Sequence, residues 1–109
     1  MIILFNKYHG AGNDFIIIDN RNNSFPAKDN KLIEKLCNRR FGIGADGLIL
    51  ICASDDSDFE MRYYNSDGYE GTMCGNGGRC SVAFAYKNNI TGSAVKFKAA
   101  DNGVCCLKN

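Results

Sequence analysis

The chain has 109 residues, of which 45% are hydrophobic, and this suits one domain with a modest core. Its 13 basic and 12 acidic residues give a net charge of +1 without a basic run, which argues against binding to nucleic acid or to a membrane surface. The apolar residues 2–5 are too few for a signal peptide or a membrane span, so we expect a cytoplasmic protein.

The first predicted elements are two strands joined by a loop. Residues 2–8 form a strand, and the glycine and Asx residues of 9–14 predict a loop. The β-branched run 15–18 is typical of a buried strand. Within the loop, Asn13 either presents its amide to a substrate or caps its own turn.

An amphipathic helix and a further strand come next. Apolar residues recur at helical spacing between residues 28 and 40, and the N-cap of this helix is either Ser24 or Asp29. The glycine loop 41–47 then leads into an apolar strand at 48–51. Because this loop follows a helix and precedes a strand, its order is the reverse of that in a phosphate-binding loop.

Several polar residues surround the next strand. Asp46 is either a turn-stabilising carboxylate or a catalytic one, and the acidic run 54–58 lacks the ligand spacing of a calcium loop. Alternating apolar and polar residues over 59–64 predict a half-buried strand. The turn at 65–68 directs the chain toward the next motif, so Asn65 is expected at the mouth of the same pocket.

The most informative stretch is residues 73–80, Met-Cys-Gly-Asn-Gly-Gly-Arg-Cys. Its glycines let the backbone turn tightly and approach a ligand at the start of a helix. The first N–H groups of such a helix bind anions, and the helix dipole favours the thiolate form of a cysteine placed there. Cys74 is therefore a candidate base or nucleophile beside a carboxylate site; the alternative is a buried structural cysteine.

The remaining segments complete one α+β unit with more strand than helix. Residues 80–86 have almost no polar face, so we expect a helix that is buried on all sides. Residues 95–99 alternate as a strand does, and 101–103 give a hairpin signal before a return strand at 104–107. We expect the six cysteines to be reduced, and the chain has no C-x-x-C pair and only one histidine, so we expect no metal site.

Four motifs, in this order, resemble those of diaminopimelate epimerase. They are KYHGAGNDF at 7–15, GIGADG at 42–47, YNSDG at 64–68 and CGNGGRC at 74–80. The resemblance spans nearly the whole chain. It implies an α+β fold in which a mixed or antiparallel sheet curls around a buried central helix as a half barrel.

The resemblance also implies a cofactor-independent isomerase that converts L,L-diaminopimelate to the meso form in lysine biosynthesis. Cys74 would be one of two cysteines that flank the α-carbon, one removing a proton and the other supplying one. Gly75 and Asn76 would bind the reacting carboxylate through backbone N–H groups. Asn13 and Asn65 would hold polar groups of the substrate.

The chain also departs from the family. Members are much longer and have two similar halves, with the second cysteine in the other half, so residues 1–109 are interpreted as an N-terminal domain whose C-terminal domain is absent. We expect this domain to be inactive alone, and the sequence leaves open whether the parent protein is a homodimer. Many relatives carry a substrate-contacting glutamine at the position of Gly47, which has no side chain to offer.

Two other functions are weighed against this one. Proline racemase and hydroxyproline epimerase use a similar cysteine turn, but typically with histidine at the position of Asn76, so the asparagine favours diaminopimelate. The other alternative is a binding or redox module that has kept the fold without the chemistry.

Overall fold

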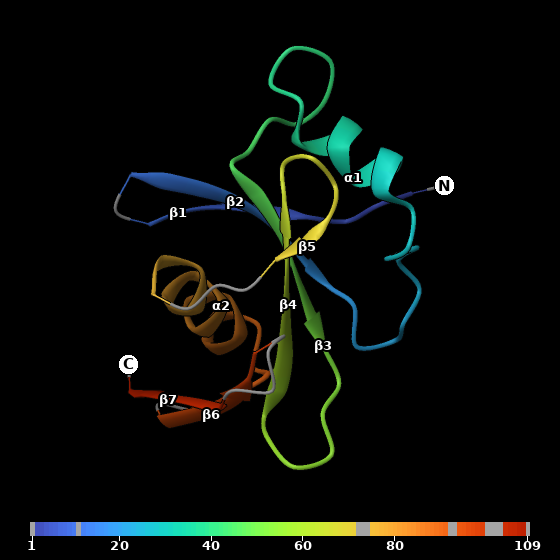
Figure 1. The fold of residues 1–109 in the computed structure, drawn as a ribbon. Coiled ribbons are helices and arrows are strands. Elements are labelled where there is room, and N and C mark those ends of the chain that lie inside the picture. The colour runs from blue at the N-terminus through green and yellow to red at the C-terminus, as the bar shows by residue number, and fades with distance from the viewer. Residues whose placement is uncertain (1, 11, 72–74, 92–93, 100–103, 109) are drawn as a thin grey trace.

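The computed structural model describes residues 2–10, 12–71, 75–91, 94–99 and 104–108, and its strands form one mixed sheet (Figure 1). In chain order the elements are β1 (Asn6–Gly10), β2 (Asn13–Asp19), α1 (Asn30–Cys37), β3 (Gly47–Cys52), β4 (Phe59–Asn65), β5 (Glu70–Gly71), α2 (Asn76–Lys87), β6 (Ala94–Lys98) and β7 (Val104–Lys108). The predicted α+β class is confirmed.

The strand order in the sheet is β1-β2-β3-β4-β6-β7, and the short β5 pairs with β4. The β2–β3 and β4–β6 pairs are parallel, whereas the other pairs are antiparallel. Helix α2 contacts β1, β2, β3, β4 and β7, and in Figure 1 it lies between the β1–β2 and β6–β7 hairpins. The turn predicted at 101–103 lies outside the described residues, but the strands on either side of it pair as a hairpin requires.

The sheet is covered on both faces, and this explains the uninterrupted apolar run in β2. Phe15 and Ile17 belong to the apolar cluster beneath α2. Ile16 and Ile18 belong to a second cluster, which includes residues of α1. Because successive side chains of a strand point to opposite faces, a strand covered on both faces needs apolar residues at every position. The predicted buried strand at 15–18 is confirmed.

The strand predicted at 2–8 begins only at Asn6, which pairs with Ile17 of β2. Ile2 and Leu4 are 90% and 82% exposed, so hydrophobicity alone did not place them in the sheet. At the other end, pairing continues through Gly10 and Asn13 where a loop was predicted. Gly12, with φ of 90°, adopts the left-handed backbone that this tight hairpin requires.

Helix α1 starts after one of the two predicted N-cap residues, and it ends earlier than predicted. The Asp29 carboxylate accepts a hydrogen bond from the Leu32 N–H at 3.0 Å, so Asp29 is the N-cap. The helix ends at Cys37 rather than near residue 40. The reason is Asn38, whose side-chain oxygen accepts from the N–H groups of Arg40 and Phe41, both at 2.9 Å, and turns the chain away.

Helix α2 begins at Asn76 and is buried on one side only, so the expectation of a helix buried all round is wrong. Arg79, Ala83 and Tyr86 share an exposed face, and Tyr86 is 53% exposed. The opposite face carries small residues, and a Cβ on Gly78 would lie 3.3 Å from the ring of Phe97. Close packing on that face, rather than overall hydrophobicity, holds the helix on the sheet.

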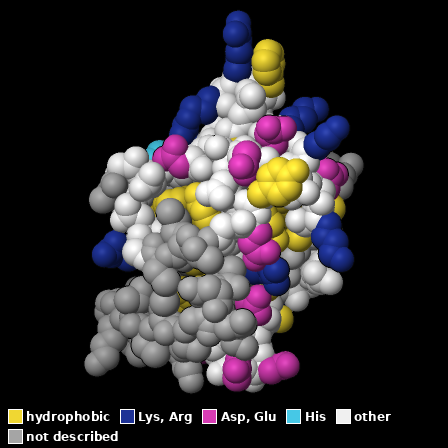
Figure 2. Space-filling view, in the orientation of Figure 1, with side chains coloured by type: hydrophobic (Ala, Val, Ile, Leu, Met, Phe, Trp, Pro, Cys, Tyr) yellow, Lys and Arg dark blue, Asp and Glu magenta, His cyan; other side chains and the backbone are white. Residues whose placement is uncertain are grey.

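The surface of the molecule has a mixed charge, in keeping with the balanced composition. Figure 2 shows acidic and basic side chains interspersed over the face that it presents. In the described part of the chain, no helix has the length and hydrophobicity needed to cross a membrane. Among the same residues, no group of three or more histidine, cysteine or acidic side chains is placed to hold a metal ion.

Replacing Asp29 with alanine should lower the free energy of unfolding by about 1 kcal/mol, because the Leu32 N–H at the start of α1 loses its side-chain acceptor. Urea unfolding followed by circular dichroism measures the change. Glu34→Ala, at an exposed position of the same helix, is the matched control and should change the free energy by less than about 0.5 kcal/mol. Equal losses in the two variants would contradict the capping role.

Candidate active site

The described residues that the sequence singled out gather at one end of the sheet. Asn13 begins β2, Gly47 begins β3 and Asn65 ends β4. The register pairs Phe15 with Gly47, and Gly47 with Asn65, so these three positions form one row across the strands. Phe15 lies on the α2 face, so Asn13, two residues earlier, and Asn65, in the same row, belong to that face as well.

Asn13 and Asn76 meet although they are 63 residues apart. The Asn76 amide nitrogen donates to the Asn13 side-chain oxygen at 3.1 Å, and the Asn76 oxygen accepts from Arg79 at 3.1 Å. The Asn13 amide nitrogen donates to Asp46 at 3.3 Å. The Asn13 amide therefore forms hydrogen bonds with residues distant in the sequence rather than capping its own turn. A side-chain amide has two N–H bonds and two oxygen lone pairs, so each end of Asn13 keeps capacity for a ligand.

A charged cluster holds Asn13 from behind. The Arg39 guanidinium donates to both oxygens of Asp14, at 3.0 and 2.8 Å, and also to Asp46 at 3.0 Å. Lys7 forms a further ion pair with Asp14 at 3.1 Å. Arg39, and then Lys7, hold the pKa of the Asp14 carboxyl well below its ordinary value, although partial burial acts in the opposite direction.

The role of Asp46 is structural in this arrangement. Its carboxylate accepts from the Asp14 backbone N–H at 3.2 Å, and its own N–H donates to the Asp14 carboxylate at 3.0 Å. These bonds fasten the glycine loop before β3 to the start of β2. The interpretation of Asp46 as a turn-stabilising carboxylate is therefore supported by its contacts. Sequence reasoning missed Arg39, which is 25 residues from Asp14 and belongs to no motif.

The start of α2 has the geometry of an anion site. Gly75 is the N-cap with φ of 66°, a backbone conformation that glycine adopts without strain, and no side chain of the described residues caps the helix. A Cβ on Gly75 would meet nothing within 4 Å among the described residues, so the space beside it is open. Uncapped N–H groups at the start of a helix attract carboxylates and phosphates. Cys74, the candidate base, lies outside the described residues.

Cys37, Cys52 and Cys80 are poor candidates for acid–base work. Burial raises the pKa of the Cys80 thiol, outweighing the opposite effect of Arg79. It also raises the pKa of Cys52, and that of Cys37 to about 11. Cys80 is 5% exposed and packs in the apolar cluster beneath α2. A thiol that stays protonated is a weak nucleophile and base.

Asn65 lies apart from the Asn13–Asn76 pair. Its amide nitrogen donates to the Tyr69 carbonyl at a long 3.5 Å, and its carbonyl accepts from the Gly68 N–H at 2.9 Å, which confirms the predicted turn. A Cβ on Gly71 would lie 2.8 Å from the Asn65 amide nitrogen. Asn65 therefore rests against the end of β5, just before the segment that leads to Gly75.

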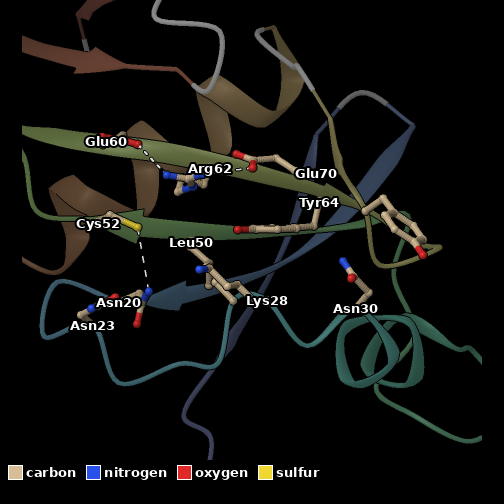
Figure 3. Close-up of a pocket in the computed structure, with 12 residues that line it drawn as sticks. Asn20, Asn23, Lys28, Asn30, Leu50, Cys52, Glu60, Arg62, Tyr64 and Glu70 are labelled. Atoms are coloured by element: carbon tan, nitrogen blue, oxygen red, sulfur yellow. Dashed lines mark hydrogen bonds and ion pairs between the residues drawn. The ribbon is translucent and has the colours of Figure 1, made fainter.

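A cavity of about 670 Å³ lies away from these residues, over β3 and β4 on the face of the sheet opposite α2 (Figure 3). None of the predicted site residues lines it. Arg62, at its wall, is already paired with Glu60 at 3.3 Å and with Glu70 at 3.0 Å. The strongest charges of this cavity thus satisfy one another. A smaller space of about 470 Å³ adjoins the start of α2 and is lined by residues of β1 and α2, Asn76 and Arg79 among them.

Comparison with known proteins identifies the relatives of the chain. The family model described as diaminopimelate epimerase matches residues 5–104. The diaminopimelate epimerase of Flavobacterium psychrophilum is 62% identical over 95 residues, which are 87% of this chain and 37% of that protein. That of Chlorobaculum tepidum is 54% identical over 92 residues, which are 83% of this chain and 35% of that protein. The chain thus spans little more than a third of the curated relatives that it matches.

Solved structures show the same fold at low sequence identity. A methylitaconate-delta-isomerase matches with a TM-score of 0.78 and 16% identity, over 97% of this chain and 58% of that one. A phenazine biosynthesis protein of the PhzF family from Bacillus anthracis matches with a TM-score of 0.68 and 17% identity, over 97% of this chain and 34% of that one. At such identities the likeness concerns the fold alone.

Replacing Asp14 with asparagine should change how stability depends on pH. The pKa of Asp14 is lower in the folded chain than its unfolded value of about 3.9, so its stabilising effect is complete above about pH 4 and is lost as the pH falls further. Asp14→Asn should be less stable by about 1–2 kcal/mol at neutral pH and should lose less stability on acidification.

Urea unfolding between about pH 7 and pH 3 measures both effects. Asp19→Asn is the matched control, because Asp19 also pairs with an arginine, Arg21, but on the surface. That variant should lose less than about 1 kcal/mol at neutral pH. An acid dependence of Asp14→Asn equal to that of the unmodified chain would contradict the argument.

Proposed function

The chain belongs to the diaminopimelate epimerase family, and we propose that the protein of which it forms part converts L,L-diaminopimelate to the meso form in lysine biosynthesis. The observation that carries the proposal is the glycine N-cap at the start of α2, with Asn76 of its first turn bonded to Asn13 of β2. Such a site can hold the α-carboxylate of an amino acid next to Cys74.

The proposed reaction needs no cofactor. The thiolate of one cysteine removes the α-proton, and the electron pair of the broken C–H bond moves into the α-carboxylate. The thiol of a second cysteine then donates its proton to the opposite face of the α-carbon, so the configuration inverts and that sulfur becomes the thiolate. Nothing is oxidised or reduced, and Cys74 supplies one of the two sulfur atoms.

The start of α2 assists both events. An ordinary cysteine has a pKa of about 8.5 and is mostly a thiol at neutral pH, whereas the positive end of a helix dipole favours the thiolate. The backbone N–H groups of Gly75 and Asn76 would bind the α-carboxylate and stabilise the charge that develops there when the proton leaves. Asn13 and Asn65, on the same face of the sheet, would hold other polar groups of the substrate.

The second cysteine belongs, in this proposal, to a C-terminal domain that resembles residues 1–109. The relatives support this division, because the chain corresponds to 37% and 35% of their lengths. We also propose that the sheet is half of a barrel that curls around α2. The free thiols Cys37, Cys52 and Cys80 suit a cytoplasmic enzyme.

Neither alternative function is favoured. The family model and the relatives described above are diaminopimelate epimerases, not proline racemases or hydroxyproline epimerases. A binding module without chemistry would not need glycine at an uncapped helix start beside a cysteine, since a side-chain cap there would add stability.

Replacing Cys74 with alanine in the parent enzyme should abolish exchange at the α-carbon of L,L-diaminopimelate. In heavy water the parent enzyme should incorporate deuterium there, and the variant should do so at least about a hundredfold more slowly. Mass spectrometry measures the incorporation. Cys52→Ala is the matched control and should keep the parent rate, and L-proline should acquire no deuterium. Undiminished exchange in Cys74→Ala would contradict the proposal.

Residues 1–109 alone should show no epimerase activity, because inversion requires a base on each face of the α-carbon. The experiment compares the isolated chain with the parent enzyme at equal concentration, following the ratio of L,L- to meso-diaminopimelate by chromatography. Circular dichroism verifies that the isolated chain is folded. Turnover by the folded chain would show that the second acid–base group lies within these residues.

A further inference from the structure

Tyr63 lies on the α2 face of the sheet, two residues before Asn65 and therefore in the row next to that of Gly47 and Asn65. It is 6% exposed and belongs to the apolar cluster beneath α2. Its ring meets that of Phe15 edge-on, with the centroids 6.2 Å apart. The next residue, Tyr64, belongs to the cluster on the opposite face, so the two tyrosines of β4 occupy different environments.

The ring of Tyr63 fills the space that Gly47 leaves empty. A Cβ on Gly47 would lie 2.5 Å from ring carbon Cε1 of Tyr63 and 2.6 Å from its hydroxyl oxygen. Any other residue at position 47 would therefore displace the tyrosine. Because glycine stands there, the Tyr63 hydroxyl lies over the start of β3.

This position is close to both groups of site residues. Gly47 directly follows Asp46, which bonds to Asn13, and it is the register partner of Asn65. Neighbouring strands are roughly 4.8 Å apart, so a substrate with an amino-acid group at each end can extend from the start of α2, past Asn13, across β3 toward Asn65. Gly47, against which the Tyr63 hydroxyl lies, is on that path.

The hydroxyl has no assigned partner. Within the described part of the chain, it makes no hydrogen bond, although every fully buried side-chain nitrogen and oxygen atom there has one. It follows that the ring is buried while its oxygen reaches accessible space. Burial, and then the negative charge of Asp46 and Asp67, raise the pKa of Tyr63, so the phenol stays neutral at neutral pH.

We propose that the Tyr63 hydroxyl is a substrate-binding group that accepts a hydrogen bond from the second amino group of diaminopimelate, the one at the end that does not react. The inference rests on the proposed function and names a contact within the same site. The inference also explains the glycine at position 47, because a side chain there would displace the phenol of Tyr63. Tyr63 would then contribute to selecting a substrate that has two amino groups.

The test uses the parent enzyme with Tyr63→Phe, which removes the hydroxyl and keeps the ring against Phe15. The KM for L,L-diaminopimelate should rise about tenfold, with kcat within about twofold of the unmodified enzyme, because a ground-state contact is lost. Thermal unfolding should be unchanged. Tyr64→Phe is the matched control: Tyr64 and Arg62 line the cavity of Figure 3, away from the candidate site, and KM should not move.

A second measurement identifies the substrate group. L-2-Aminopimelate lacks the second amino group, so its inhibition constant should be equal, within about twofold, for the unmodified enzyme and Tyr63→Phe. A change as large as that in KM would assign the bond to a carboxylate and overturn the proposal. An unchanged KM for diaminopimelate in Tyr63→Phe would also overturn it. Failure of the unmodified enzyme to exchange deuterium into diaminopimelate would instead reject the proposed function.

Discussion

The candidate site depends on holding two carboxylates, Asp14 and Asp46, side by side at the start of β2. Two negative charges so close would repel one another, but each carboxylate accepts the backbone N–H of the other residue, and Arg39 bridges both. The pair fixes the loop before β3 relative to β2. It thereby fixes Asn13, which donates a hydrogen bond to Asp46 and accepts one from Asn76 of α2. A charged cluster behind the site thus sets the position of the neutral groups that face it.

Helix α2 begins without the side-chain cap that stabilises many helices. A side chain at the N-cap typically stabilises a helix by about 1 kcal/mol, and α2 has none. The helix is held instead by close packing, because its buried face includes Gly78 against the ring of Phe97. On the other side, a Cβ on Gly10 would lie 3.0 Å from the Asn76 Cβ, so β1 also approaches the first turn closely. Tertiary packing therefore positions the first turn of α2, which has no side-chain cap among the described residues.

Much of the fold could be predicted because its strands carry local signals, whereas the errors arose where tertiary contacts decide. The apolar runs at 15–18 and 48–51 identified β2 and β3, and Asp29 was one of two proposed caps. Residues 2–5 are just as apolar, but pairing with β2 begins at Asn6, so no sheet neighbour extends the strand over them. The end of α1 was missed because the side chain of Asn38 forms a local turn that periodicity does not reveal.

The same contrast applies to the candidate site: some of its features have local sequence signals, whereas others depend on contacts between distant residues. The unusual backbone conformation at the start of α2 could be predicted from the sequence, because the glycine there indicates a geometry that other residues rarely adopt. The contact of Tyr63 with Gly47 is not legible, since the two residues are 16 positions apart and neither is unusual alone. Period-two alternation did place Tyr63 and Tyr64 on opposite faces. They differ in what lies beside them: Tyr64 shares a cavity wall with Arg62, whereas the neighbour of Tyr63 is Gly47, which has no side chain. Among the described residues no group bonds to the Tyr63 hydroxyl, and its oxygen reaches accessible space over Gly47, where a ligand can bond to it.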